Sequence, residues 1–294
     1  MLATLVPNPF HKPNWVYEEK YDGIRILAYK EGQEISLITR NDVNRTNDFP
    51  KIATAISGLK ASTLLLDGEV VIFDERGVSR FQLLQRRSGD AKYALFDCLF
   101  VNGRDLRSAP LSVRRENLES AVKFGNVLLL SARLAENGFE AFRVSQRRGF
   151  EGVVAKDASS PYVEGRSRYW LKVKVRQEEE FIIGGYTPPA GSRKHFGALL
   201  LGAYEQGVLR YVGKVGTGFD ETTLGSLFRK FQPLKRQESP FVPSPRIKNA
   251  TFLSPKLVAQ ISFTEWTRDG KLRQPVFLGL REDKSPKEVV FERH

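Results

Sequence analysis

Short runs of apolar residues, either continuous or alternating with polar residues, fill the first 175 positions and are separated by turn-forming residues. A period of two favours strands, whereas apolar spacings of three and four favour helices. One Asp-Gly pair, Asp22-Gly23, separates two of these runs and suggests a hairpin or a tight turn. The pattern predicts helices at 50–60 and 111–124, and strands at 15–20, 24–30, 34–40, 63–73, 93–101, 127–130, 152–156 and 169–175.

The pattern changes at the charge run 176–180, Arg-Gln-Glu-Glu-Glu, where we place a domain boundary. Five short strands and one helix beyond it suit a small β-barrel, and the OB-fold is such a barrel. Prolines at 240, 243, 245 and 255 indicate a long loop that holds Arg246 and Lys248. This loop is either a solvated connector or a DNA clamp. The helix is predicted at 221–231, and the strands at 181–186, 198–204, 208–215, 257–266 and 276–280.

Composition narrows the class of protein. A chain of 294 residues suggests two domains, which we expect at 1–179 and 180–294. The single cysteine, Cys98, excludes a disulfide framework and a Cys₄ zinc module. Lys and Arg number 46 against 34 Asp and Glu, a net charge of +12. That surplus suggests a polyanionic partner such as nucleic acid, the alternative being a generic basic surface. We find no apolar run long enough to cross a membrane and no secretory leader.

Two segments carry basic side chains in patterns that suggest phosphate chemistry. Glu18 and Lys20 share one face of a predicted strand, and a turn at Asp22-Gly23 can bring Arg25 back near that face. This group is either a functional cluster or a surface ion-pair cluster. Lys172 and Lys174 also share a strand face, where they repel each other unless an anion lies between them. That pair predicts a phosphate site or a solvated strand face.

Acidic residues at strand edges form the other candidate site. Glu69, in Asp67-Gly68-Glu69, and Glu151 each lie at the edge of an apolar strand. Two such carboxylates meeting in a cleft would bind Mg²⁺ or Mn²⁺, whereas each taken singly is a strand-end charge. The segment 281–284, Arg-Glu-Asp-Lys, considered by itself is a charged tail.

The order of these strings resembles the covalent nucleotidyltransferase superfamily, which comprises ATP-dependent DNA ligases, RNA ligases and mRNA capping enzymes. Four further segments are similar to the ligase domain of bacterial ligase D, namely M-L-A-T-L at 1–5, I-I-G-G-Y-T-P-P at 182–189, F-G-A-L-L-L-G at 196–202 and G-K-V-G-T-G-F at 213–219. The resemblance covers essentially the whole chain. The motifs, in order, are K-Y-D-G-I-R at 20–25, T-R at 39–40, D-G-E at 67–69, Y-A-L-F-D at 93–97, E-G-V-V-A-K at 151–156, W-L-K-V-K at 170–174 and R-E-D-K at 281–284.

The resemblance implies an α+β fold, in which a nucleotidyltransferase domain of ATP-grasp-like antiparallel sheets precedes a small OB-fold β-barrel. It also implies three steps: Lys20 takes AMP from ATP, AMP passes to a DNA 5′-phosphate, and a 3′-hydroxyl displaces AMP. A lysine attacks only when it is neutral, and we expect Lys172, Lys174 and a divalent metal to disfavour its charged form.

The resemblance assigns a role to each matching residue. Glu18 is expected to meet the adenine amino group and Phe96 to stack on the ring. Arg25, Arg40 and Arg166 are expected on the sugar-phosphate and DNA-phosphate side. The remaining roles are Lys172 and Lys174 on the α-phosphate, Glu69 on ribose or metal, Glu151 on metal, and Arg281 with Lys284 on the leaving pyrophosphate, which requires domain closure.

The expected partners are nicked or broken duplex DNA, Ku and a repair polymerase, for a monomer at the bacterial nucleoid. Nineteen residues precede Lys20, so we expect a two-domain core without a DNA-encircling helical domain. Two alternatives remain open: an RNA ligase or capping-type nucleotidyltransferase, and a nucleic-acid-binding module without activity. Comparing ATP with GTP, and nicked DNA with RNA, separates the first alternative. Loss of Lys20, Glu151 or Lys172 would mark the second, and all three are present.

Overall fold

The chain forms two compact units, Met1–Arg176 and Gln177–His294. A computed structural model describes residues 1–175, 177–189, 191, 193–267 and 269–291. The second unit begins before position 180, because its strand β12 (Glu178–Tyr186) starts at Glu178, which pairs with Ser262. Arg176, the first residue of the charge run, lies outside the described residues.

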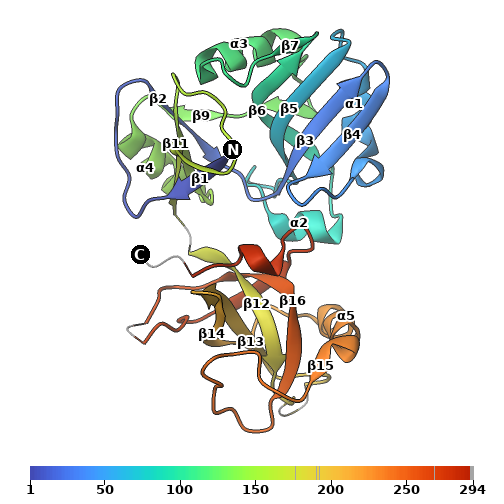
Figure 1. The fold of residues 1–294 in the computed structure, drawn as a ribbon, viewed down its shortest axis with the longest axis vertical. Helices are drawn as coiled ribbons and strands as arrows, with labels where there is room; N and C mark the ends of the chain where they lie inside the picture. Colours follow the sequence, from blue (N-terminus) through green and yellow to red (C-terminus); the bar gives the residue numbers. More distant parts are fainter. Residues whose placement is uncertain (176, 190, 192, 268, 292–294) are drawn as a thin grey trace. The chain divides into compact units, whose positions relative to one another are not determined.

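The first unit contains two sheets, and β2 and β3 belong to different ones. The expected hairpin at Asp22-Gly23 is therefore wrong: this pair carries the chain from one sheet to the other (Figure 1). Gly23 is required there, since a Cβ would overlap the carbonyl oxygen of Val70. The first sheet has the order β1 (Leu2–Leu5), β11 (Arg166–Lys174), β10 (Gly152–Asp157), β2 (Trp15–Lys20), β9 (Arg133–Ala135).

The second sheet holds most of the apolar core of the first unit. Most neighbours in both sheets are antiparallel, as expected, but β1–β11 and β6–β8 run parallel. A register shift between Asp67 and Gly68 falls opposite Phe96. The order is β4 (Glu34–Thr39), β3 (Ile24–Glu31), β5 (Thr63–Val71), β6 (Lys92–Val101), β7 (Arg104–Asp105), with β8 (Leu128–Leu130) paired to β6.

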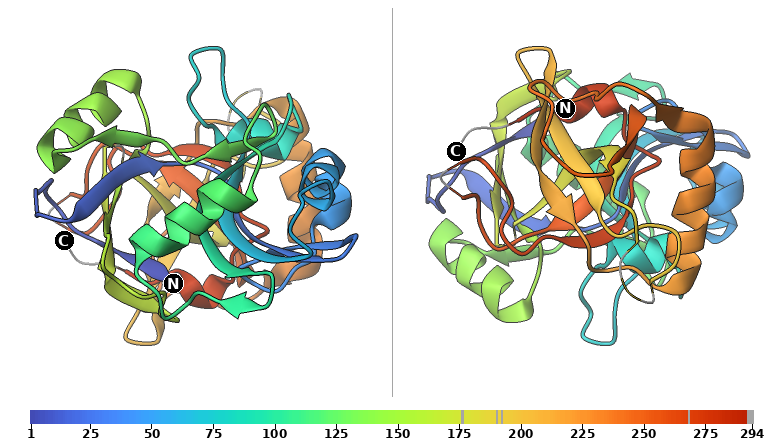
Figure 2. Two further views of the ribbon diagram at one scale, coloured as in Figure 1. Left: turned by 90° about the horizontal axis from the view of Figure 1, so that it is seen from above. Right: turned by 90° about the horizontal axis from the view of Figure 1, so that it is seen from below.

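Helices cover the outer faces of these sheets. In Figure 2, α1 and α4 lie on opposite outer sides of the first unit, and α3 packs against β6. The sequence analysis missed α4, although its signals were present: the Asn137 side chain accepts from the Phe139 amide, and Gly149 ends the helix at φ 72°. The helices of this unit are α1 (Pro50–Ser57), α2 (Phe81–Arg86), α3 (Leu111–Ala121) and α4 (Gly138–Arg148), with a 3₁₀ turn, η1 (Thr46–Asp48).

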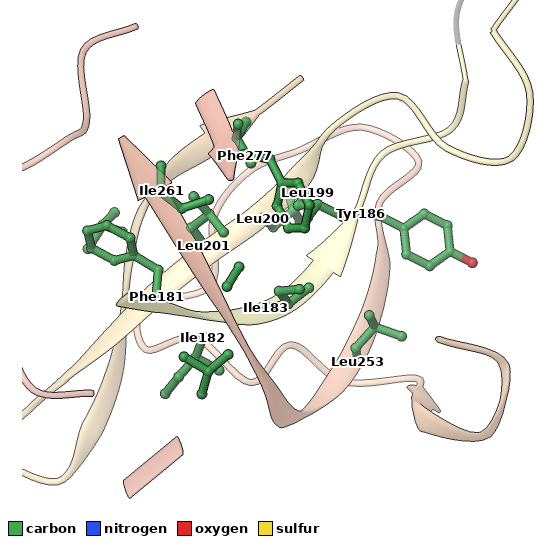
Figure 3. Packing of buried hydrophobic residues seen from close by; sticks show 14 of the residues in the cluster. Phe181, Ile182, Ile183, Tyr186, Leu199, Leu200, Leu201, Leu253, Ile261 and Phe277 are labelled. Atoms are coloured by element: carbon green, nitrogen blue, oxygen red, sulfur yellow. The ribbon is translucent and has the colours of Figure 1, made fainter. Parts of the chain in front are cut away.

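The described residues of the second unit form one sheet and a single α-helix, α5 (Glu221–Phe231), whose apolar side packs into the core. Figure 3 shows this core between the strands, with the Tyr186 hydroxyl pointing away from it. The order is β14 (Val208–Val215), β13 (Leu199–Glu205), β12, β16 (Thr251–Ser262), β15 (Lys235–Arg236), with β17 (Val276–Leu280) paired to β16; the 3₁₀ turns are η2 (Gln232–Leu234) and η3 (Pro286–Glu288).

Strand β16 corrects one expectation about the proline-rich loop. The strand begins at Thr251, not at 257, so Pro255 lies inside it. Pro255 is tolerated because the register between β12 and β16 shifts over this stretch, where Ile183 pairs with Leu257 and Gly185 with Phe252. None of the helices in the described part of the chain has the length and apolar content needed to cross a membrane.

Candidate active site

Three strands of the first sheet place the predicted lysines side by side. Lys20 on β2 is opposite Gly152 on β10, which is opposite Lys174 on β11. Two residues further along the strands, on the same face, Glu18 is opposite Val154, which is opposite Lys172. Directly opposed residues of antiparallel strands share a face, so these side chains point to the same side of the sheet.

The middle position of the lysine row has no side chain. A Cβ on Gly152 would overlap the carbonyl oxygen of Val173, so only glycine fits there. Lys174 is half-buried, whereas Leu171 and Val173 on the other face are buried, as the alternation predicts. The row therefore combines an amine with a second cation across an open stretch of backbone.

Lys20 forms an ion pair with Glu151, which immediately precedes β10. Burial lowers the pKa of Lys20, but the Glu151 carboxylate, together with Asp22 and Glu69, outweighs it and raises the pKa above its ordinary value. In the ligand-free chain the carboxylates therefore decide the direction of the pKa shift, and the expected effect of Lys172 and Lys174 together with a divalent metal stays a prediction. The nearest charges to Lys20 are carboxylates, so the resting amine is an ammonium.

The same carboxylates bear on metal binding. Glu151 and Glu69 both act electrostatically on Lys20, which places them around one point. Among the described residues, no cluster of three or more His, Cys, Asp or Glu exists that could hold an ion by itself. Carboxylate and phosphate oxygens suit Mg²⁺, which keeps waters and shares substrate phosphates. The donors present thus fit a metal held jointly by protein and nucleotide.

Arg25 is fixed on the second sheet, opposite Glu69 on β5. Its Nε and Nη2 donate to the two Asp67 oxygens at 2.9 and 2.6 Å, and the Tyr162 hydroxyl donates to Asp67 at 2.9 Å. Asp67 is fully buried, so this pair is largely shielded from water. The motif residues Asp67 and Arg25 therefore orient each other, and the sequence analysis missed Tyr162.

An aromatic box, formed by Phe96 and Trp170, contacts a buried lysine beside this pair. Phe96 on β6 and Trp170 on β11 meet edge to face, with their centroids 5.7 Å apart. The Lys156 ammonium lies 4.2 Å from the Phe96 centroid and 4.4 Å from the Trp170 centroid. Burial lowers the pKa of Lys156, against the opposing charge of Glu18. Phe96 is thus held rigidly, with its ring already in contact with a cation.

Glu18 is buried and accepts three side-chain hydrogen bonds. Arg115 on α3 donates to Oε1, while Lys156 and Ser131 donate to Oε2 at 2.7 and 3.0 Å. The neighbouring Arg114 is also buried and pairs with Asp97, next to Phe96, at 2.7 and 3.0 Å. Sequence reasoning missed these arginines, because two adjacent arginines on a helix ordinarily indicate a solvated face.

Four predicted residues are not part of the contacts described so far: Arg40, Arg166, Arg281 and Lys284. Arg40 follows β4 in the second sheet and is exposed, and Arg166 begins β11, where it donates to the Ala3 carbonyl at 3.1 Å. Arg281 and Lys284 belong to the second unit. Arg281 is buried there and bonds both oxygens of Asp283, at 2.9 and 2.7 Å.

Two family models match the chain. The model described as "ATP dependent DNA ligase domain" matches residues 1–174, and the one described as "ATP dependent DNA ligase C terminal region" matches residues 192–284. The chain belongs to the ATP-dependent DNA ligase family. The resemblance seen in the motifs is confirmed.

Curated relatives and solved structures agree with this assignment. The multifunctional non-homologous end joining protein LigD of Pseudomonas aeruginosa is 39% identical, over 99% of this chain and 36% of its own length. LigD of Mycolicibacterium smegmatis is 38% identical, over 95% and 37%. This ligase chain therefore spans just over a third of each relative.

The fold is similar to that of a solved structure, "mycobacterial DNA ligase D complexed with ATP and MES". The match has a TM-score of 0.70 and 34% identity, and it covers 99% of this chain and 98% of that one. The ligase domain of Mycobacterium tuberculosis LigD gives 0.52 at the same identity. The predicted fold class, α+β with a nucleotidyltransferase domain and an OB-fold domain, is confirmed.

Proposed function

We propose that this chain seals nicks and breaks in duplex DNA with ATP, through AMP bound covalently to Lys20. The observation that carries the proposal is the row of Lys20, Gly152 and Lys174, with Lys172 one row away. An amine facing two further cations across bare backbone suits attack on a phosphate, because the cations neutralise charge that develops on its oxygens.

The first step begins with transfer of a proton from the Lys20 ammonium to solvent water. The Nζ lone pair then forms a bond to the α-phosphorus, and the bond from that phosphorus to pyrophosphate breaks. Lys172 and Lys174 stabilise the charged α-phosphate oxygens. Glu151 holds the Lys20 ammonium in place through the ion pair before nucleotide and metal bind.

The next two steps transfer AMP and close the break. An oxygen of the DNA 5′-phosphate attacks the α-phosphorus and releases Lys20, which regains its proton. The 3′-hydroxyl then gives up its proton to solvent water and attacks the 5′-phosphate, which expels AMP and leaves a phosphodiester. Each step is a displacement at phosphorus, so the contribution of the protein is positioning and charge neutralisation.

The nucleotide would lie against the aromatic box and against the strand faces that carry Lys20, Lys172 and Lys174. Phe96 provides a rigid ring for stacking on adenine, and Glu18 provides an acceptor for the base edge. Arg25, held by Asp67, faces the sugar-phosphate side, as do Arg40 and Arg166 in this proposal. Arg281 and Lys284 would orient the leaving pyrophosphate.

A divalent metal, Mg²⁺ or Mn²⁺, would be held by Glu151 and Glu69 together with nucleotide phosphates. When bound, it withdraws charge from phosphate oxygens as a Lewis acid. Glu151 would then exchange its ion pair with Lys20 for the cation.

The proposed pathway is non-homologous end joining in the bacterial nucleoid, with Ku and a repair polymerase as partners of a monomeric ligase. This proposal is supported by the two LigD relatives, which are named as non-homologous end joining proteins. The basic net charge of +12 suits a DNA substrate.

Label transfer tests the proposal. The protein is mixed with ATP labelled at the α-phosphate and with Mg²⁺ or Mn²⁺, denatured, and examined for label on the polypeptide, before and after a chase with nicked DNA. We expect label that requires Lys20, is not formed from GTP, and moves onto DNA. Folded protein that takes no label, and that is not purified already adenylated, would contradict it. Label from GTP alone would indicate capping-type chemistry.

A further inference from the structure

The carboxylate of Glu18 is held by donors from three separate elements. Arg115 comes from α3, Lys156 from β10, and Ser131 from the segment between β8 and β9. Glu18 is 1% exposed, and the side chains of Arg115 and Lys156 are 4% and 3% exposed. One buried carboxylate thus faces two buried cations.

Lys156 connects this carboxylate to the aromatic box. Its ammonium lies 2.7 Å from Glu18 Oε2 and 4.2 Å from the Phe96 centroid. Lys156 therefore links the position of the Glu18 carboxylate to that of the Phe96 ring. On the other side, Arg115 prevents the carboxylate from rotating, since it holds the second oxygen.

An ionised carboxylate accepts hydrogen bonds and donates none. Adenine presents an amino donor at the position where guanine presents a carbonyl acceptor. A fixed anion therefore attracts adenine and repels guanine, whereas a protonated or rotating carboxyl distinguishes them poorly. Selection between the two bases then depends on whatever holds the Glu18 carboxylate immobile.

We propose that Arg115 and Lys156 are positioning residues that set the preference for an adenine over a guanine nucleotide by holding Glu18 as a fixed anion. The inference rests on the proposed function, because it requires the base to stack on Phe96 and to present its edge to Glu18. Neither cation needs to touch the nucleotide. Their effect is on discrimination between bases, separate from the chemistry at Lys20.

The test measures binding, which separates it from the label-transfer test of the proposed function. In a Lys20→Ala background, affinities for ATP and GTP are measured by calorimetry, and their ratio is compared among variants. We expect the parent to prefer ATP at least tenfold. Arg115→Met and Lys156→Met should each reduce the ratio by about tenfold, which is the scale of one base-edge contact.

Three further variants sharpen the result. Arg115→Lys keeps the charge and should retain most of the preference. Arg143→Met removes an exposed arginine of α4 and should leave the ratio unchanged. Ser131→Ala removes only a neutral donor and should lower the ratio about threefold. It carries the test if a charge-removing variant does not fold, since breaking a buried ion pair is strongly destabilising.

Two results would overturn the inference while leaving the ligase assignment intact. One is equal affinity of the parent for ATP and GTP. The other is an unchanged ratio in every folded variant of Arg115, Lys156 and Ser131. A lower affinity for both nucleotides at a constant ratio belongs to the second result, because it would show a role in packing alone.

Discussion

Glu19, immediately before Lys20, places a carboxyl group in the interior of the first unit. Its side chain alternates to the face opposite Lys20 and is 6% exposed. Oε1 has no hydrogen-bond partner among the described residues. Burial raises the pKa of Glu19 from 4.5 to about 8, against the opposing charge of Arg148. The folded chain therefore holds this group as a neutral acid over much of the physiological range.

The sign of the effect on stability follows from proton binding. Between pH 4.5 and about 8 the folded chain binds more protons at Glu19 than the unfolded chain does, so the free energy of unfolding falls as pH rises. Each pH unit in that window costs about 1.4 kcal/mol. Neutral pH lies 2.5 pH units above the lower limit, which makes the cost there at most about 3 kcal/mol.

Glu19→Gln keeps the shape of the side chain and removes its ionisation. We expect the variant and the parent to unfold with similar free energies near pH 4.5, and the variant to be more stable by up to about 3 kcal/mol near neutrality. Urea denaturation followed by circular dichroism, repeated across this pH range, measures the difference. Because the chain has two units, each can unfold in its own transition. The comparison uses the unfolding transition whose midpoint the substitution changes.

Glu75→Gln, at an exposed turn, is the matched control. It should change the free energy of unfolding by less than about 0.5 kcal/mol, without a pH trend. A stability difference for Glu19→Gln that stays constant with pH would refute the reasoning, because it would show that the carboxyl is not held neutral.

Three other substitutions test the site and the fold. Lys174→Ala should slow label transfer from ATP about 100-fold in single-turnover measurements, since one charge on the α-phosphate is lost; a loss below threefold would contradict that role. Gly152→Ala should lower the free energy of unfolding by roughly 2 kcal/mol through overlap with the neighbouring strand, whereas Gly125→Ala, which has open space, should be near neutral in the same urea titration. Asp283→Ala should slow self-adenylation about tenfold by releasing the arginine it holds, yet spare sealing of a pre-adenylated nick; equal losses in the two assays would count against a role in the pyrophosphate step.

Most strands were predictable because apolar periodicity is local. The alternation at 169–175 indicated correctly that Lys172 and Lys174 share a face, and the strand at 276–280 has the predicted bounds. The hairpin at Asp22-Gly23 failed because the turn signal reports a change of direction only. It cannot report that β3 pairs with β5, some 40 residues away, and not with β2.

The charge state of Lys20 could not be derived from its neighbours in sequence. The motif order suggested that nearby cations would lower the pKa, but the raised pKa comes from Glu151, 131 positions away. Which charge dominates depends on distance and burial, and these are set only when β2 and β10 pair.

The sequence by itself determined the apolar faces, the strand-rich second half and the motif residues, because each depends on residue type and short-range spacing. Tertiary structure alone decided the partners of the buried charges. Arg114 and Arg115 look like a solvated helix face in the sequence, yet they are buried against Asp97 and Glu18. A charged side chain is buried only where a counter-charge and hydrogen-bond partners are present, and elements distant in the chain supply those partners.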